Sequence, residues 1–478
     1  MSSTFSGLST AYSSLVAQRQ ALEVAGQNIA NANTEGYTRQ RVSMSAVSSN
    51  TVTSLWSSST ATSGNGVTVA SLERLSDQFL DSRLRTQTAS AAQAEATAST
   101  LESLESVVAD LTDDTGITTA LSDFWNAWQD VANAPDSDSA RTVLLGTAET
   151  LTIQMADAYN SFESLWDEGR TSVDAYVTEV NTTAATIADL NEQIRGITTS
   201  GGSANELIDQ RDLLITQLSE LTGATAVLQD DGTANVFLDG NMLVQGNSAT
   251  EIVATGSYGM AAALAEPVSA DAVSLQWANG NSLTLDGGTL AGVVASLQPT
   301  SEGGSISAAV DAINDLATRV ADQVNAIHAA GYAIDGTTTG NDFFAIAAGT
   351  PAALGISVAI SDTDLIAAGD GANGEYDGSI ADAISQLSTA EDGPDSTWQT
   401  YIVDLGVATA SARTRADSAE ATRATAESQQ LANASVDIDE EVTNMVAYQR
   451  AYEAASRVMT AMDEMLDTLI NSTGLVGR

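Results

Sequence analysis

A narrow stripe of apolar residues marks each end of this chain, and the two stripes restrict its fold more than any other feature. At the N-terminal end the spacing alternates between three and four residues, with Arg19 and Gly26 in the two missing positions. Such a stripe is typical of a helix that packs along a coiled-coil seam, because a helix in a globule needs a wider apolar face. The stripe consists of Phe5, Leu8, Tyr12, Leu15, Leu22 and Ile29. Residues 31–37 are rich in Asn and Gly, which tolerate left-handed backbone, so they are predicted to end the helix.

The second stripe lies at the C-terminal end and predicts a helix from about residue 431 to residue 470. It consists of Ile438, Val442, Met445, Tyr452, Met459, Met462, Leu466 and Leu469. Carboxylates in residues 437–441 would stabilise the dipole of this helix at its first turn. The economical arrangement pairs the two seam helices with each other and then with copies from neighbouring subunits. The alternative, in which each stripe docks on its own domain, stays open.

We therefore expect the two ends of the chain to form an assembly interface. Its apolar core would come from the two stripes, and the turn after the first helix would direct the chain away from it. The candidate interface residues are Leu8, Tyr12, Leu15, Leu22, Ile29, Asn31, Asn33, Gly36, Tyr37, Val442, Met445, Tyr448, Tyr452, Met459, Leu466 and Leu469.

The charge of the chain excludes several classes of protein. Its 478 residues include 62 acidic residues, 17 basic residues that are all Arg, one His and no Cys, for a formal net charge of -45. Disulfide scaffolds, thiolate zinc sites and catalytic Cys or Lys are therefore excluded. Phosphate backbones and anionic lipid surfaces would repel such a chain, so we expect no nucleic-acid partner. No apolar run reaches the length of a membrane helix, so we expect no membrane insertion, and no cleaved signal peptide is recognisable.

The middle of the chain alternates between long helical patterns and a short region of period two. Helices are predicted over residues 86–111, 140–196, 206–221 and 305–330, and again from near residue 398. Between them, Asp-Gly and Asn-Gly turns flanked by apolar residues predict two hairpins. The fold class is mainly α and elongated: a discontinuous terminal coiled-coil domain and a long helical bundle with a small inserted β domain. The predicted domains are 1–50 with 431–478, 51–223 with 301–430, and 224–300 as an outer β-rich domain.

Few residues in the chain could support catalysis. His328 is the only imidazole and lies in an apolar helical stretch, so a packed or capping role is expected for it. Aspartate clusters at 113–114, 136–138 and 335–342 could supply oxygen ligands for Ca²⁺, but none has the spacing of an EF-hand loop. We expect no enzyme activity, no cofactor and no metal site.

Both ends of the chain also carry motifs that resemble a known family. Residues 28–40 (NIANANTEGYTRQ) look like the N-terminal signature of the flagellar rod, hook and hook-associated axial proteins. Residues 440–454 (EEVTNMVAYQRAYEA) and 463–470 (DEMLDTLI) resemble their C-terminal signature.

Within that axial family the middle is most similar to the hook-associated protein 1 family. The similarity rests on residues 204–214 (ANELIDQRDLL), 229–236 (QDDGTANV), 324–332 (VNAIHAAGY) and 341–344 (NDFF). After Phe344, longer members of the family carry a larger outer insertion, so a further outer domain is in doubt here.

The resemblance implies a structural subunit at the junction between flagellar hook and filament. It implies self-assembly into a ring, with hook protein and hook-associated protein 3 as axial neighbours. It also implies export through the flagellar type III apparatus to the cell exterior and an export chaperone at the C-terminal helix. The alternatives are another axial protein, of hook or filament type, and an acidic secreted calcium-binding or hydrolytic protein.

Overall fold

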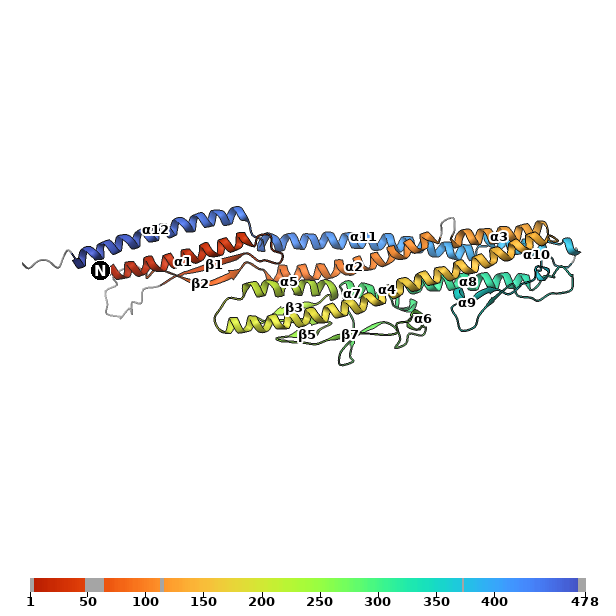
Figure 1. Cartoon of the computed structure of the whole chain (residues 1–478), viewed down its shortest axis with the longest axis horizontal. Helices are drawn as coiled ribbons and strands as arrows, with labels where there is room; N and C mark the ends of the chain where they lie inside the picture. The colour runs from red at the N-terminus through yellow and green to blue at the C-terminus, as the bar shows by residue number, and fades with distance from the viewer. Residues whose placement is uncertain (1–3, 48–63, 112–115, 372–373, 472–478) are drawn as a thin grey trace, which may run out of the picture.

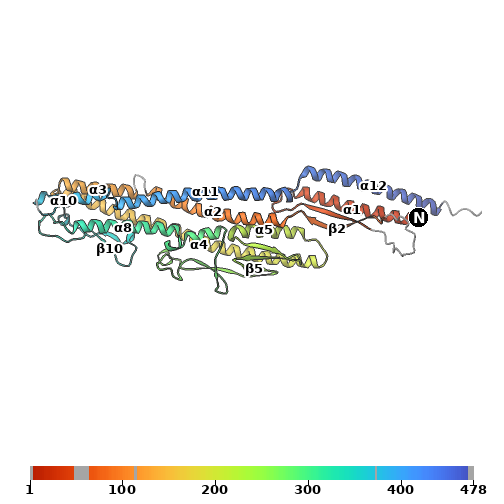
Figure 2. The ribbon, with the colours of Figure 1, turned by 180° about the vertical axis from the view of Figure 1, so that it is seen from behind.

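The structure is a computed structural model that describes residues 4–47, 64–111, 116–371 and 374–471. The molecule is elongated, and the start of helix α1 (Thr4–Ala30) and the end of helix α12 (Ile438–Asn471) lie at the same tip (Figure 1). The same arrangement is seen from behind in Figure 2, where the narrow terminal part continues into a wider bundle. The confirmed fold class is mainly α, with a few small sheets.

The narrow part pairs the two ends of the chain. Helix α1 (Thr4–Ala30) lies against helix α12 (Ile438–Asn471), and the two run in opposite directions. A two-stranded antiparallel sheet of β1 (Gln40–Ala46) and β2 (Val67–Arg74) covers another side of α1. The sequence therefore predicted the partner of each seam helix correctly.

The wider part is a bundle around one long helix. This helix, α4 (Asp138–Thr199), has 62 residues, and Ser137 caps its start by accepting a hydrogen bond from the backbone N–H of Ala140. The other main helices are α2 (Gln78–Asp110), α3 (Ile117–Asn133), α5 (Asn205–Thr222), α7 (Thr289–Ser296), α8 (Ser305–His328), α10 (Ser379–Ser385) and α11 (Pro394–Ala434). Their apolar faces meet in a continuous core in which the largest side chains, such as Phe162 and Trp166, are fully buried.

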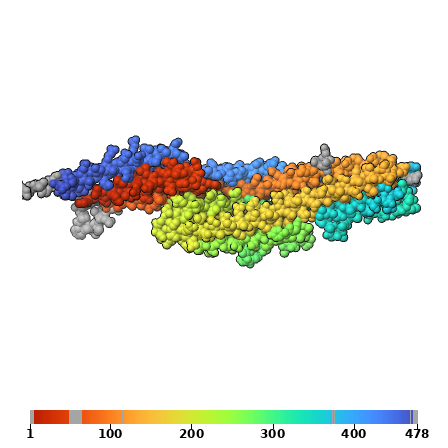
Figure 3. Space-filling view, viewed as in Figure 1, coloured from red at the N-terminus to blue at the C-terminus, as the bar shows by residue number. Residues whose placement is uncertain are grey.

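The inserted β region packs on α4 along one side of the bundle (Figure 3). One sheet has the order β3-β4-β5-β6 and another the order β7-β8-β9, and neighbouring strands are antiparallel. Its strands are β3 (Thr225–Leu228), β4 (Ala234–Leu238), β5 (Asn241–Gln245), β6 (Ser248–Ala249), β7 (Ile252–Thr255), β8 (Ser274–Trp277) and β9 (Ser282–Leu283), with α6 (Met260–Ala263) between β7 and β8. Both predicted hairpins are present, because Gly232 and Gly280 adopt the positive φ that their turns require.

Short elements cover the bundle at the end far from the termini. A small sheet pairs β10 (Phe344–Ile346) with β11 (Ile356–Val358), and α9 (Ala352–Gly355) lies between them. In the described part of residues 346–400 these elements pack on the bundle core, and no larger outer insertion is present.

Two elements were missed, and one helix start was predicted too early. The β1–β2 sheet was not predicted, and it joins residues on both sides of the proposed boundary at residue 50. Helix α3, over residues 117–133, was also missed. The C-terminal helix begins at Ile438 and not near residue 431, because Ser435 is extended and the Asp437 carboxylate caps the new helix.

Candidate assembly interface

The buried apolar residues of α1 are small. Ala11, Ala17, Ala21 and Ala25 are the apolar residues of α1 that are buried, where this helix contacts α12 and the β1–β2 sheet. Gly7 lies so close to the Met462 side chain that an added Cβ would be 2.6 Å from its methyl carbon. Small side chains let helices and strands approach closely, and within one chain α1 buries its alanines more completely than its stripe of large residues.

The predicted interface residues are therefore incompletely covered within one chain. Of those whose side chains the structure describes, none is classed as buried. Leu8, Leu15, Leu22, Ile29, Asn31, Tyr37, Met445, Tyr448, Tyr452, Met459 and Leu466 are half-buried, and Tyr12, Asn33, Gly36 and Val442 are exposed. Tyr12 is 60% exposed, and the Leu469 side chain lies outside the described residues. Their role as an interface between copies remains a proposal.

The turn after α1 is built by the polar residues of the N-terminal motif. Asn28 is buried, and its side chain donates to the carbonyl of Gln40 (2.9 Å) and accepts from the N–H of Gln40 (3.0 Å). The Tyr37 hydroxyl donates to the same amide oxygen (2.9 Å), and Asn31 donates to the carbonyl of Gln27. Burial, together with nearby carboxylates such as Asp209, raises the pKa of Tyr37 to about 12. Gly36 has a φ of 74° and lies against Leu213, so the backbone needs glycine here.

Arg39 ties this turn to the start of α12. Its guanidinium lies 2.7 Å from a Glu441 carboxylate oxygen and 2.9 Å from one of Glu440. The Glu441 side chain is only 5% exposed, and hydrogen bonds from Arg39 lower the pKa of Glu440. The backbone N–H of Arg39 also donates to the carbonyl of Ala434 (2.9 Å). The two terminal segments are thus held together at the point where both leave the bundle.

A second arginine ties the turn to the bundle. Arg74, at the end of β2, donates to Asp209 (2.8 Å) and Asp212 (3.0 Å) of α5. Asp209 also accepts from the N–H of Thr38 (3.3 Å), and its burial raises its carboxyl pKa. We call α1 and α12 the terminal pair, and the region where they meet the bundle the joint. These bonds cross the joint and fix the orientation of the terminal pair relative to the bundle.

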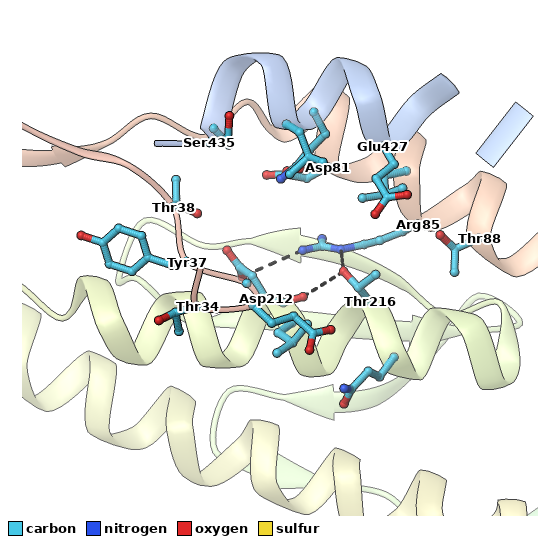
Figure 4. Close-up of a pocket in the computed structure, with 18 of the residues that line it drawn as sticks. Thr34, Tyr37, Thr38, Asp81, Arg85, Thr88, Asp212, Thr216, Glu427 and Ser435 are labelled. Atoms are coloured by element: carbon cyan, nitrogen blue, oxygen red, sulfur yellow. Dashed lines mark hydrogen bonds and ion pairs between the residues drawn. The ribbon is translucent and has the colours of Figure 1, made fainter. Parts of the chain in front are cut away.

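A cavity of about 490 Å³ opens beside this joint (Figure 4). It lies between the turn 32–38 and helices α2, α5 and α11, and both apolar and charged side chains line it. Arg85 points into it; its closest carboxylate oxygen, on Asp212, is 4.0 Å away, and burial lowers the pKa of Arg85. The sequence did not predict this cavity, because its walls come from four separate segments.

The residues considered for catalysis or metal binding have structural partners. His328 is fully buried: its Nδ1 lies 2.8 Å from the carbonyl of Asn341, and its Nε2 accepts from the N–H of Ala367. Asp335 accepts from the backbone of its own turn. In the part of the chain that the structure describes, no group of three His, Cys, Asp or Glu residues could hold a metal ion; residues 113–114 lie outside it. None of the described helices is long and apolar enough to cross a membrane.

Three segments of the chain match family models of flagellar proteins. Residues 101–344 match the flagellar hook-associated protein FlgK helical domain. Residues 8–38 match the flagella basal body rod protein model, and residues 427–472 match the C-terminal model of the flagellar basal body rod FlgEFG proteins. A helical middle between two rod-type ends that pair with each other defines an axial structural protein of the bacterial flagellum.

Within that class, the chain belongs to the family of flagellar hook-associated protein 1, FlgK. It is 31% identical to flagellar hook-associated protein 1 of Bacillus subtilis (strain 168) over 100% of both chains. The relative in Escherichia coli (strain K12) is 29% identical over 354 residues, which cover 73% of this chain and 61% of the relative. The solved structure of the flagellar hook junction protein FlgK from Burkholderia pseudomallei has a TM-score of 0.62 at 17% identity. It covers 74% of this chain and 100% of the solved one, and it supports the fold alone.

Proposed function

We propose that this chain is a non-enzymatic subunit of the junction between the flagellar hook and filament. The observation that carries the proposal is the incomplete burial of the terminal helices. Large apolar residues on α1 and α12, among them Leu15, Val442 and Met459, remain half-buried or exposed, although the two helices already pack together. Covering this surface with other copies of the chain removes apolar area from water, which favours assembly.

In this proposal the terminal pair forms the inner wall of a tube and the bundle makes contacts further out. Copies related by rotation form a closed ring when each uses one surface for one neighbour and a different surface for the next. The axial neighbours are hook protein below and hook-associated protein 3 above. The acidic β region faces solvent, where its charge opposes nonspecific association.

The proposal also includes the route of the chain to its site. It is exported unfolded through the flagellar type III apparatus to the cell exterior, and an export chaperone holds the C-terminal helix before export. The absence of Cys from the sequence suits this route, because the unfolded chain cannot form disulfides.

Two linked measurements test the function. In a strain lacking the chain, the full-length protein should restore filaments, and electron microscopy of labelled protein should locate it between hook and filament. Removing residues 1–40 or 435–478 should leave a soluble helical monomer that restores no filaments. Filament growth with either truncated protein, or label along the whole hook or filament, would refute the proposal.

A further inference from the structure

Phe79 is a large aromatic side chain that the fold leaves in water. It lies in the first turn of α2, at the joint between the terminal pair and the bundle, and is 71% exposed. Arg83 follows one helical turn later on the same face and is also exposed. Its guanidinium donates to the side chain of Gln429 on α11 (2.9 Å), and no carboxylate of the described residues lies within ion-pair distance of it. A cation paired only with a neutral amide is unusual in a chain with this excess of acids.

The cavity at the joint opens on the opposite flank of the same two helices. At 3.6 residues per turn, Phe79 lies across α2 from the lining residues Asp81, Leu84 and Thr88. On α11 the arrangement repeats, because Gln429 lies across the helix from the lining residue Leu431. One subunit therefore has a projection on one flank and a cavity on the other, at the same level along its long axis.

The two flanks are complementary in shape and charge. Apolar contact within the cavity is available from Leu84, Leu213 and Leu431, and Leu431 is 47% exposed. The charged lining residues are five acids and three arginines: Glu35, Asp81, Asp212, Glu220, Glu427, Arg74, Arg85 and Arg423. Glu35 and Glu220 are exposed, and no described residue forms an ion pair with either of them. The excess of carboxylates suits an incoming guanidinium, and the apolar walls suit a ring.

We propose that Phe79 of one subunit inserts into the joint cavity of the next copy of this chain, where Arg83 approaches Glu220. A contact between unlike surfaces on opposite flanks is the head-to-tail kind that closes a ring. The Phe79 ring packs beside Leu213 and Leu431 and offers its face to the Arg85 guanidinium, whose ion pair with Asp212 is long at 4.0 Å. This inference rests on the proposed assembly of copies side by side, and it identifies which surfaces meet.

Thiol crosslinking tests the contact directly, because the chain has no Cys of its own. The variant Phe79→Cys with Gln217→Cys places one thiol on the projection and one at the exposed rim of the cavity. In flagella from a complemented strain, a short bismaleimide should give a ladder of covalent multimers. The matched control is Phe79→Cys with Ile153→Cys, whose second site is 58% exposed on α4 outside the cavity; it should give no ladder. Equal ladders from both pairs, or none from the first, would overturn the contact.

Exchanging the charges of Arg83 and Glu220 provides a second test of the contact, which does not depend on how well the thiol variants assemble. Arg83→Glu and Glu220→Arg should each lower filament number. The expected decrease is up to about fivefold, which corresponds to the loss of one exposed ion pair at each contact between subunits. The double variant should recover at least half of the wild-type number, and failure to recover counts against the contact. Filaments that grow normally without crosslinks refute this contact and leave the junction function intact. Wild-type protein that is absent from the junction refutes the function itself.

Discussion

The terminal pair and the bundle are both helical, but they bury different kinds of residue. In the bundle, large side chains such as Phe124, Trp128 and Phe162 are fully buried within one chain. In the terminal pair, α1 buries alanines and leaves Leu15 and Tyr12 half-buried or exposed. Since burial of large apolar groups supplies most folding energy, the bundle is expected to be stable alone and the pair to depend on neighbouring copies.

The largest expected effect lies in the bundle core. Phe162→Ala on α4 removes a fully buried ring and should lower the free energy of unfolding by about 3–5 kcal/mol. Ile153→Ala on the same helix is the control, because its side chain is 58% exposed and should cost less than about 1 kcal/mol. Urea unfolding followed by tryptophan fluorescence measures both, since the described tryptophans all lie outside α1 and α12. Similar losses of unfolding free energy in both variants would contradict the burial of Phe162 in the bundle core.

The second effect concerns the joint between the two regions. Arg39→Ala should leave the Glu441 carboxylate buried without its cation, at a cost of about 1.5–3 kcal/mol for lost charged hydrogen bonds. The loss should fall on the terminal pair, so amide exchange of α12 should accelerate while that of α4 stays unchanged. Arg41→Ala is the control, because Arg41 and its partner Glu73 are both exposed. Equal acceleration in the two variants would mean that Arg39 does not hold the joint.

The fold was predictable where the sequence has contrast between apolar and polar positions. The long apolar series of α4 and the turn at Gly232 identified a helix and a hairpin because each is a local pattern. The β1–β2 sheet has a weaker signal: its first strand alternates apolar residues with serine only over residues 42–46, and residues 47–66 separate the two strands. Helix α3 was missed although its sequence has this contrast: Leu121, Phe124 and Trp128 follow helical spacing and are buried.

The candidate interface was predictable in part for a related reason. Large residues drew attention to one stripe of α1, but the apolar residues of α1 that are buried within the chain are alanines such as Ala21, which are equally common on exposed helix surfaces. The joint depends on contacts between distant segments: Arg39 meets Glu441 across 402 positions of sequence. No periodicity within a short window can reveal such pairs.

A smaller effect tests the bundle through pH. Burial lowers the pKa of His328 below its usual 6.5, so below that pH the unfolded chain takes up a proton more readily than the folded one. This contribution to stability is complete above about pH 6.5 and is lost as the pH falls toward the folded-state pKa. Protonation of Nε2 would remove the acceptor for the Ala367 N–H, which is a further physical reason for the folded state to resist protonation. Urea unfolding at pH 7 and pH 5 should show a larger drop for wild type than for His328→Gln. Equal drops would contradict a buried neutral imidazole.

A substitution in the apolar stripe of α1 should have the smallest effect on the stability of the isolated chain but a large effect on assembly. Leu15→Ala shortens a half-buried side chain on α1, so the isolated chain should lose about 1 kcal/mol or less. In the assembled tube the same side chain would be fully covered, and the loss would recur in every copy. Filament number in a complemented strain should therefore fall severalfold, while Glu23→Ala on the same helix, which removes only an exposed ion pair, should leave it unchanged.

If Leu15→Ala destabilised the isolated chain as much as Phe162→Ala, the contrast between a self-sufficient bundle and a dependent terminal pair would be wrong. If Leu15→Ala left filament number unchanged, the stripe of large residues on α1 would face solvent in the tube. The contacts that α1 makes through its buried alanines would then be sufficient for assembly.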